Sequence, residues 1–144
     1  MTLLSTAMTL WLAAGPAERP TLVVQAPDSP VRLDHATILA GAEGPPVLLY
    51  AATNLTDHQL EQFTIIAFIF SADGTLKARQ MAPARRTLDA NATKYSTMVL
   101  DGFPIDPSDV IVVGVSQAQR VDSEVWWRAD IQAAAEAAAR RKKP

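Results

Sequence analysis

Histidine and aspartate are the residue types in this 144-residue chain that could carry chemistry. His35 could act as a general base, and Asp101, Asp106 and Asp109 stand together in the stretch DGFPIDPSD. A histidine acts as a base only where a substrate pocket and an orienting carboxylate converge on it. Because a single histidine in a strand is more often packed than catalytic, we predict a structural role for His35. A small hydrolase or metal-dependent enzyme that uses His35 with the loop aspartates stays open as an alternative.

The three loop aspartates could also hold Ca²⁺, which prefers carboxylate oxygens. Their spacing does not match an EF-hand loop, and aspartate next to proline and serine is ordinary turn chemistry. His58 falls in a polar turn, where its imidazole is expected to be solvated. The chain has no cysteine, nucleophile-elbow serine motif or glycine-rich phosphate loop. We therefore predict no catalytic residue, no metal and no cofactor.

Two adjacent tryptophans in the stretch SEVWWR point to a binding site rather than a catalytic site. Successive side chains of a strand point to opposite faces, so one ring should enter the core while the other faces outward. Trp126 shares its face with the charged residues Glu124 and Arg128, which predicts that Trp127 fills the core. Trp126 and Arg128 are then the candidate binding residues, since an exposed tryptophan can anchor a partner. The alternative is that Arg128 or the alanine-rich tail covers Trp126.

The elements that must position these residues are strands, predicted from alternating or fully apolar segments that turn signals separate. The segments are 31–39, 47–55, 60–70, 76–81, 94–100, 110–121 and 125–128. Asp73-Gly74 predicts a hairpin after the most apolar segment, and Asn91 can adopt the left-handed conformation of a turn. About seven strands without a helical period predict an all-β antiparallel sandwich over residues 31–128.

The core of this sandwich is predicted from the apolar positions of the strands. In the first segment, the period-two alternation places His35 on the face of Val31, Leu33 and Leu39. Segment 60–70 is apolar on both faces, which indicates a central strand. The predicted core residues are Leu33, Leu48, Tyr50, Phe63, Ile65, Ile66, Phe68, Leu88, Val99, Val112, Val115 and Trp127.

The two ends of the chain differ from this body. Residues 1–17 join a short apolar run to small residues at a cleavage-like position, which predicts a signal peptide and an extracytoplasmic location. No Lys or Arg precedes that run, and the alternative is an N-terminal helix or strand that packs on the domain. Residues 18–30 are rich in proline and predict a linker or an edge segment. Residues 129–144 predict an alanine-rich helix with Asp130 as N-cap. Its one large apolar residue is Ile131, so the helix has little to bury and should be only marginally stable.

Four stretches occur in a family-like order: NLTD at 54–57, ADGT at 72–75, LDANAT at 88–93, and VD at 121–122 with tryptophan shortly after. Over about residues 31–128 this order resembles the small bacterial extracytoplasmic immunoglobulin-like domains, of which the FxLYD type is one. Ala90-Asn91 stands where that family has Pro-Gly, and the FxLYD string is absent. The resemblance implies an immunoglobulin-like sandwich that is secreted or envelope-anchored and carries no shared catalytic residue.

These patterns together predict a non-enzymatic, exported binding or structural module of the cell envelope, whose partner is an unidentified protein or envelope component. Ligands of such folds bind at loops or edge strands, so an assembly subunit that pairs its edge strands with another chain is a further alternative. A formal net charge of −2 argues against nucleic acid as a partner. The basic cluster 140–143 either solubilises the tail or makes weak contact with an anionic membrane surface.

Overall fold

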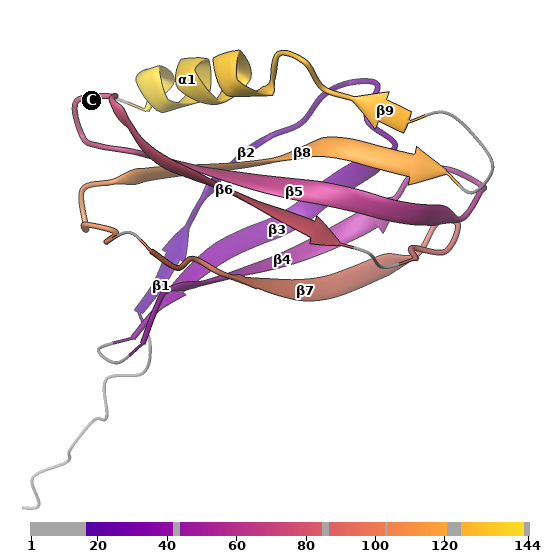
Figure 1. Cartoon of the computed structure of the whole chain (residues 1–144), viewed down its shortest axis with the longest axis horizontal. Coiled ribbons are helices and arrows are strands. Elements are labelled where there is room, and N and C mark those ends of the chain that lie inside the picture. Colours follow the sequence, from indigo (N-terminus) through magenta and orange to yellow (C-terminus); the bar gives the residue numbers. More distant parts are fainter. Residues whose placement is uncertain (1–16, 42–43, 85–86, 103, 121–124, 143–144) are drawn as a thin grey trace, which may run out of the picture.

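The computed structural model describes residues 17–41, 44–84, 87–102, 104–120 and 125–142, and in them the strand-forming segments make two stacked sheets (Figure 1). The first sheet has the order β1 (Ala17–Pro20), β3 (Val31–Ala40), β4 (Val47–Asn54), β7 (Thr93–Val99). The second has the order β2 (Leu22–Val24), β8 (Val110–Arg120), β5 (Leu60–Phe70), β6 (Leu76–Ala84), and β9 (Val125–Trp127) pairs with β8. The helix α1 spans Ile131–Arg141. The predicted all-β sandwich with a short C-terminal helix is confirmed.

The main core lies between the two sheets and takes alternate side chains from the long strands. The predicted core residues are buried except Val99 and Trp127, which are 46% and 65% exposed. Met98 of β7 and Leu100, the residue after this strand, are buried, so Val99 between them points outward. The prediction that Val99 and Trp127 belong to the core is therefore wrong.

Strand β5 is apolar on both faces because both faces are covered. It lies between β8 and β6, as its composition predicted, and the Asp73-Gly74 hairpin joins it to β6. From Phe63 onward its odd-numbered apolar side chains enter the core between the sheets, as does Leu60 before the register shift, and the even-numbered ones pack under α1. The even-numbered set is Ile66, Phe68 and Phe70.

The alanine-rich tail forms α1 on the outer face of the second sheet (Figure 1). Ile131, Ala135 and Ala139 are buried there, so the expectation that this helix has little to bury is wrong. The short alanine side chains let the helix lie close to the sheet, where many small contacts add up. Gly114 of β8 completes the fit, since a Cβ atom there would lie 3.0 Å from Ile131 Cδ1.

A β-bulge in β3 changes which side chains face the core. The register against β4 shifts between Leu33 and His35. Val31 and Leu33 are buried before the bulge, and Ile38 is buried after it. His35 is exposed, so the prediction that it shares a face with Val31 and Leu33 is wrong. Alternation read from sequence cannot reveal such a shift, because a bulge inserts one extra residue into one strand.

Residues 17–24, most of which fall in the predicted linker or edge segment, form two short edge strands that belong to different sheets. β1 pairs with β3 in the first sheet, the chain crosses over at Thr21, and β2 then runs parallel to β8 in the second. The Thr21 hydroxyl donates to the Ala36 carbonyl at 2.8 Å and holds this crossing. β2 pairs with residues 112–114 of β8 and β9 pairs with residues 117–119, so both short strands share one edge of β8.

The two predicted terminal segments differ in how much of them the structure describes. The predicted signal peptide, residues 1–17, lies outside the described residues apart from Ala17, where β1 begins. Over the described ranges, no helix has the length and apolar character that crossing a membrane requires. Asp130 occupies the N-cap position as predicted, but its side chain makes no capping hydrogen bond and accepts one from Arg128 Nε at 3.2 Å instead. Arg140 and Arg141 stand in the last turn, where cations suit the helix dipole.

Candidate functional site

The structure reverses the predicted places of the two tryptophans. Trp126 is half-buried and packs against the core, whereas Trp127 is the exposed ring. The reason is the pairing of β9 with β8, in which Trp126 lies opposite Ala118, whose side chain is buried. Directly opposed residues of an antiparallel pair share a face of the sheet. The prediction of Trp126 as the outer ring is therefore wrong, and Trp127 takes its place as the exposed aromatic residue.

The other predicted binding residue, Arg128, is engaged by the fold. Its Nη1 donates to the Val24 carbonyl at the end of β2 at 2.8 Å, and its Nε lies 3.2 Å from Asp130 Oδ1. Its backbone N–H donates to the Ser116 carbonyl at 3.0 Å. The side chain is 10% exposed, so its charge does not mark an outward face. Arg128 joins β2 to β9 at the point where the edge of β8 changes its partner.

Trp126 fixes the loop between β2 and β3. Its Nε1 donates a hydrogen bond to Asp28 Oδ2 at 3.1 Å. In the same loop the hydroxyl of the buried Ser29 donates to the Val31 carbonyl at 2.7 Å, so the loop is held on both sides. Sequence reasoning missed Asp28, because an aspartate between prolines is typical of a turn and its partner is 98 positions away.

An open groove of about 910 Å³ lies beside these residues, and we name it the tryptophan groove. Its lining consists of residues 27–30, Leu55, Thr56, Leu60, Ala118, Arg120 and β9. Trp127 and Leu55, which is 45% exposed, supply apolar surface, and Arg120 adds a positive charge. The groove thus sets exposed apolar side chains beside polar groups, and clefts that combine the two are common binding sites.

One wall of the tryptophan groove depends on Asn54, which is fully buried at the end of β4. Its Nδ2 donates to the carbonyls of His58 and Leu88 at 2.7 and 3.0 Å. Its Oδ1 accepts from the Thr56 N–H and hydroxyl at 2.9 and 2.8 Å. This one side chain therefore ties the turn after β4 to the turn before β7, where Asn91 has the predicted left-handed conformation with φ of 59°.

His35 lies away from the tryptophan groove, on the outer face of the first sheet. It stands opposite Ala51 and lines a shallow hollow of about 370 Å³ together with Tyr95. Within the described ranges no hydrogen bond or ion pair joins His35 to the three loop aspartates, and no group of three or more His, Asp or Glu could hold a metal ion. The other histidine, His58, is exposed beside Asp57, with 3.2 Å between Nε2 and Oδ1.

The carboxylate next to His35 in the sequence belongs to a structural network. Asp34 accepts hydrogen bonds from the Thr53 hydroxyl and, at 2.5 Å, from Arg32 Nε. The Thr53 hydroxyl also contacts the Thr93 hydroxyl at 2.6 Å. The hydrogen bond from Thr53 lowers the pKa of Asp34 below its usual value; Arg32 adds to this effect and burial opposes it. Asp34 thus links the ends of β3 and β4 as a carboxylate anion.

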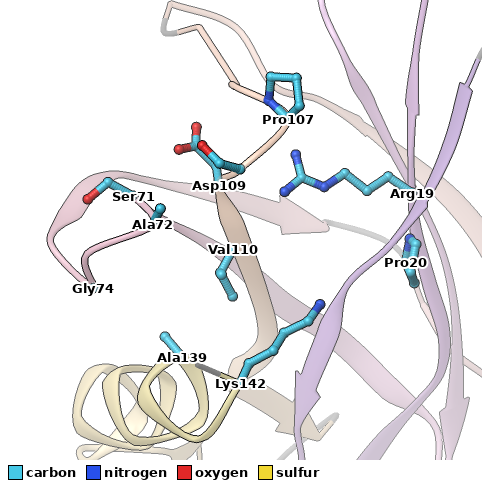
Figure 2. A pocket seen from close by; sticks show the side chains of 11 residues that line it. Arg19, Pro20, Ser71, Ala72, Gly74, Pro107, Asp109, Val110, Ala139 and Lys142 are labelled. Carbon is cyan, nitrogen blue, oxygen red and sulfur yellow. The ribbon is translucent and has the colours of Figure 1, made fainter. Parts of the chain in front are cut away.

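Two of the loop aspartates bind Lys77 of β6. The buried Asp109 accepts from Lys77 Nζ at 2.6 Å and from the Asp106 N–H at 2.8 Å, and the Asp106 carboxylate lies 3.1 Å from the same Nζ. The hydrogen bond to Asp109 raises the pKa of Lys77 above its ordinary value. Figure 2 shows Asp109 at a hollow of about 380 Å³ into which Arg19 and Lys142 extend. These carboxylates neutralise a lysine at this end of the sandwich.

No protein-family model matches the chain, and no curated protein sequence matches it. The resemblance to FxLYD-type domains stays a prediction from the order of turns and strands. A sandwich fold by itself does not define a function, since one fold serves many. We base the functional inference on the tryptophan groove.

Proposed function

We propose that the protein is a non-enzymatic, exported binding module that holds an extended segment of a partner protein in the tryptophan groove. The single observation that carries this proposal is the exposure of Trp127, a large aromatic side chain that is 65% exposed. The preceding residue, Trp126, is held by its hydrogen bond to Asp28. Tryptophans in such positions supply much of the binding energy of protein interfaces. Since β9 is paired to β8, the ring is presented without a large ordering cost.

The lining of the groove favours a peptide segment over a sugar. Leu55 and the two prolines of residues 27–30 offer aliphatic surface beside Trp127, which suits an apolar side chain. Polar groups of the lining are already engaged in the fold, because Asp28 binds Trp126 and the Ser29 hydroxyl binds a carbonyl. Arg120 is the charged lining residue that is suited to receive a carboxylate of the partner.

The test is quantitative capture from an envelope extract, followed by calorimetric titration of the captured protein. Trp127→Ala should weaken the affinity at least tenfold, the usual scale for an aromatic anchor. Met81→Ala is the matched control, because Met81 is a 56% exposed apolar residue outside the groove lining, and it should bind as the wild type does. Equal affinities for wild type and Trp127→Ala would refute the proposal, as would binding of glycans without any protein.

Export is proposed on the pattern of residues 1–17 and is tested separately. N-terminal sequencing of the protein from the envelope fraction should find a chain that begins near Glu18. Such a chain keeps residues 18–20 of β1, which pair with residues 37–39 of β3. An intact Met1 on a cytoplasmic protein would contradict export while leaving the binding proposal standing.

A further inference from the structure

The edge strands of the two sheets differ in how they are protected. β1 is four residues long and ends in Pro20, and β2 and β9 are three residues each. β6 carries Lys77, Arg79 and Pro83. β7 is seven residues long, has no proline and has Lys94 as its one charge. Short length, charge and proline are the devices that prevent a sheet edge from pairing with another chain, and β7 has little of any of them.

The backbone groups that β7 presents at its open edge follow from its pairing with β4. The Leu100 N–H donates to the Pro46 carbonyl, and the Ala92 carbonyl accepts from the Asn54 N–H, each at 2.8 to 2.9 Å. Even-numbered residues thus point their backbone groups toward β4, and odd-numbered residues point theirs away. The contact of Val99 fits this assignment, because its carbonyl accepts a hydrogen bond from the Gln80 side chain at 2.6 Å on the side of the strand away from β4. The remaining outward groups belong to Thr93, Tyr95 and Thr97.

We propose that two copies of the chain pair antiparallel through β7, about a two-fold axis that passes through Tyr95. The outward positions read Thr-Tyr-Thr in both directions, so the axis sets Tyr95 opposite Tyr95 of the second copy and Thr93 opposite Thr97. Lys94 then lies opposite Ser96, which places no like charges against each other. The first sheet becomes an eight-stranded sheet that spans both copies.

The side chains on the outer face favour a second copy as the occupant of this edge. Tyr95 is 79% exposed, and it borders the shallow hollow formed with Leu49, Ala51 and Thr97. In the dimer the two tyrosine rings stand side by side on one continuous face, an aromatic cross-strand pair flanked by threonine pairs. An interface of five residues on each side buries less than the roughly 1,000 Å² of a stable dimer, so association is weak and depends on concentration.

Single cysteines in this cysteine-free chain test the register directly. Opposed residues that exchange hydrogen bonds have Cα atoms about 5.5 Å apart, within the range that a disulfide spans. Tyr95→Cys should therefore give an oxidised dimer at millimolar concentration. Val99→Cys is the matched control on the same strand and face, because its two copies would lie about 27 Å apart, eight residues along the strand. Cross-linking of Val99→Cys as fast as Tyr95→Cys, or of neither, would overturn the proposal.

Sedimentation velocity of the full chain gives the non-covalent test. The average mass should rise from micromolar to millimolar concentration for wild type and for Met81→Lys, which adds a lysine on β6. Tyr95→Lys should remain monomeric, since it sets two positive charges opposite each other. Trp127→Ala should dimerise as wild type does, which separates this interface from the tryptophan groove. A wild-type protein that is monomeric throughout, or Tyr95→Lys that still dimerises, would refute pairing through β7.

Discussion

Replacing Asn54 by alanine should destabilise the protein more than any other substitution of a polar turn residue near the tryptophan groove. The side chain is fully buried, and its Nδ2 donates to the carbonyls of His58, Leu88 and Asp89 at 2.7, 3.0 and 3.2 Å. Its Oδ1 accepts two further hydrogen bonds from Thr56. Alanine removes all of these contacts, and the Thr56 N–H and the Asp89 carbonyl then lose the side-chain partner that Asn54 gives them.

The size of the effect follows from counting these bonds. The three Nδ2 contacts share two hydrogens and count as two bonds, so that Asn54 contributes about four bonds at roughly 1 kcal/mol each. The Leu88 carbonyl keeps its bond from the Leu60 N–H, and water can reach the half-buried carbonyls, which lowers the sum. We expect Asn54→Ala to cost about 3 kcal/mol of unfolding free energy, a large value for one residue.

Urea unfolding followed by circular dichroism measures this loss. With a slope of about 2 kcal/mol/M, the midpoint should fall by about 1.5 M while the slope stays constant. Gln59→Ala is the matched control, because this exposed side chain makes one hydrogen bond to Asp89 in the same turn and should cost less than about 0.5 kcal/mol. An Asn54→Ala midpoint within experimental error of the Gln59→Ala midpoint would show that Asn54 does not hold the two turns together.

Asn54→Asp keeps the shape of the side chain and adds a pH dependence of known sign. An ionised carboxylate would face the carbonyl oxygens that Nδ2 now binds, so folding would raise its pKa above the unfolded value of about 3.9. Such a group stabilises the folded state below the unfolded pKa and loses that contribution as pH rises through the folded pKa. The stability gap between Asn54→Asp and wild type should therefore be smaller at acid pH than at neutral pH.

Four further substitutions test other parts of the fold. Trp126→Ala should lower the unfolding free energy by about 2–3 kcal/mol and Trp127→Ala by less than about 1 kcal/mol in the same urea assay; equal losses would contradict the register of β9. Gly114→Val should lower the unfolding free energy by about 2 kcal/mol and lower the melting temperature, because its Cβ would lie 3.0 Å from the nearest atom of α1. An unchanged melting temperature would show that the helix shifts without loss of stability. Lys77→Met should destabilise the protein at neutral pH. The hydrogen bond to Asp109 raises the pKa of Lys77, so the stabilisation that the ion pair gives is complete below the unfolded pKa of about 10.4 and is lost as pH rises through the folded pKa. The curves of stability against pH for wild type and Lys77→Met should therefore converge at alkaline pH. Parallel curves would mean that the ion pair contributes nothing.

Sequence reasoning succeeded where local chemistry decides the structure. The Asp73-Gly74 hairpin and the left-handed Asn91 follow from backbone preferences of a few residues, and neither depends on a distant partner. The central place of β5 was predictable as well, because a segment that is apolar on both faces needs cover on both. What no local pattern could indicate is that one of these covers is a helix rather than a second strand layer.

Sequence reasoning failed where a distant strand decides the structure. The alternation of β3 predicts one face for His35, and the bulge against β4 turns that side chain to the opposite face. The expectation for α1 failed for a related reason. Alanines have little apolar area of their own, and their burial depends on a sheet surface that fits the helix, where Gly114 leaves room for Ile131. The contact of Asp28 with Trp126 and those of Asn54 with Leu88 and Asp89 were missed because these partners lie tens of residues away.

The tryptophan pair shows why charge is a poor guide to which face of a short edge strand lies outward. Arg128 and Glu124, which lies outside the described residues, were predicted to mark the solvent side, yet Arg128 lies at a seam where β2 and β9 both end on the same edge of β8. At this seam Arg128 Nη1 donates to the Val24 carbonyl at 2.8 Å, and with the side chain 10% exposed its charge lies against the backbone of the fold. The position of Arg128 is therefore explained by its hydrogen bond to a backbone carbonyl. The position of Trp126 is explained by its packing against the core and by its hydrogen bond to Asp28. Trp127 is the aromatic residue of β9 whose exposure the fold does not explain, and this is the reason to look for its partner outside the chain.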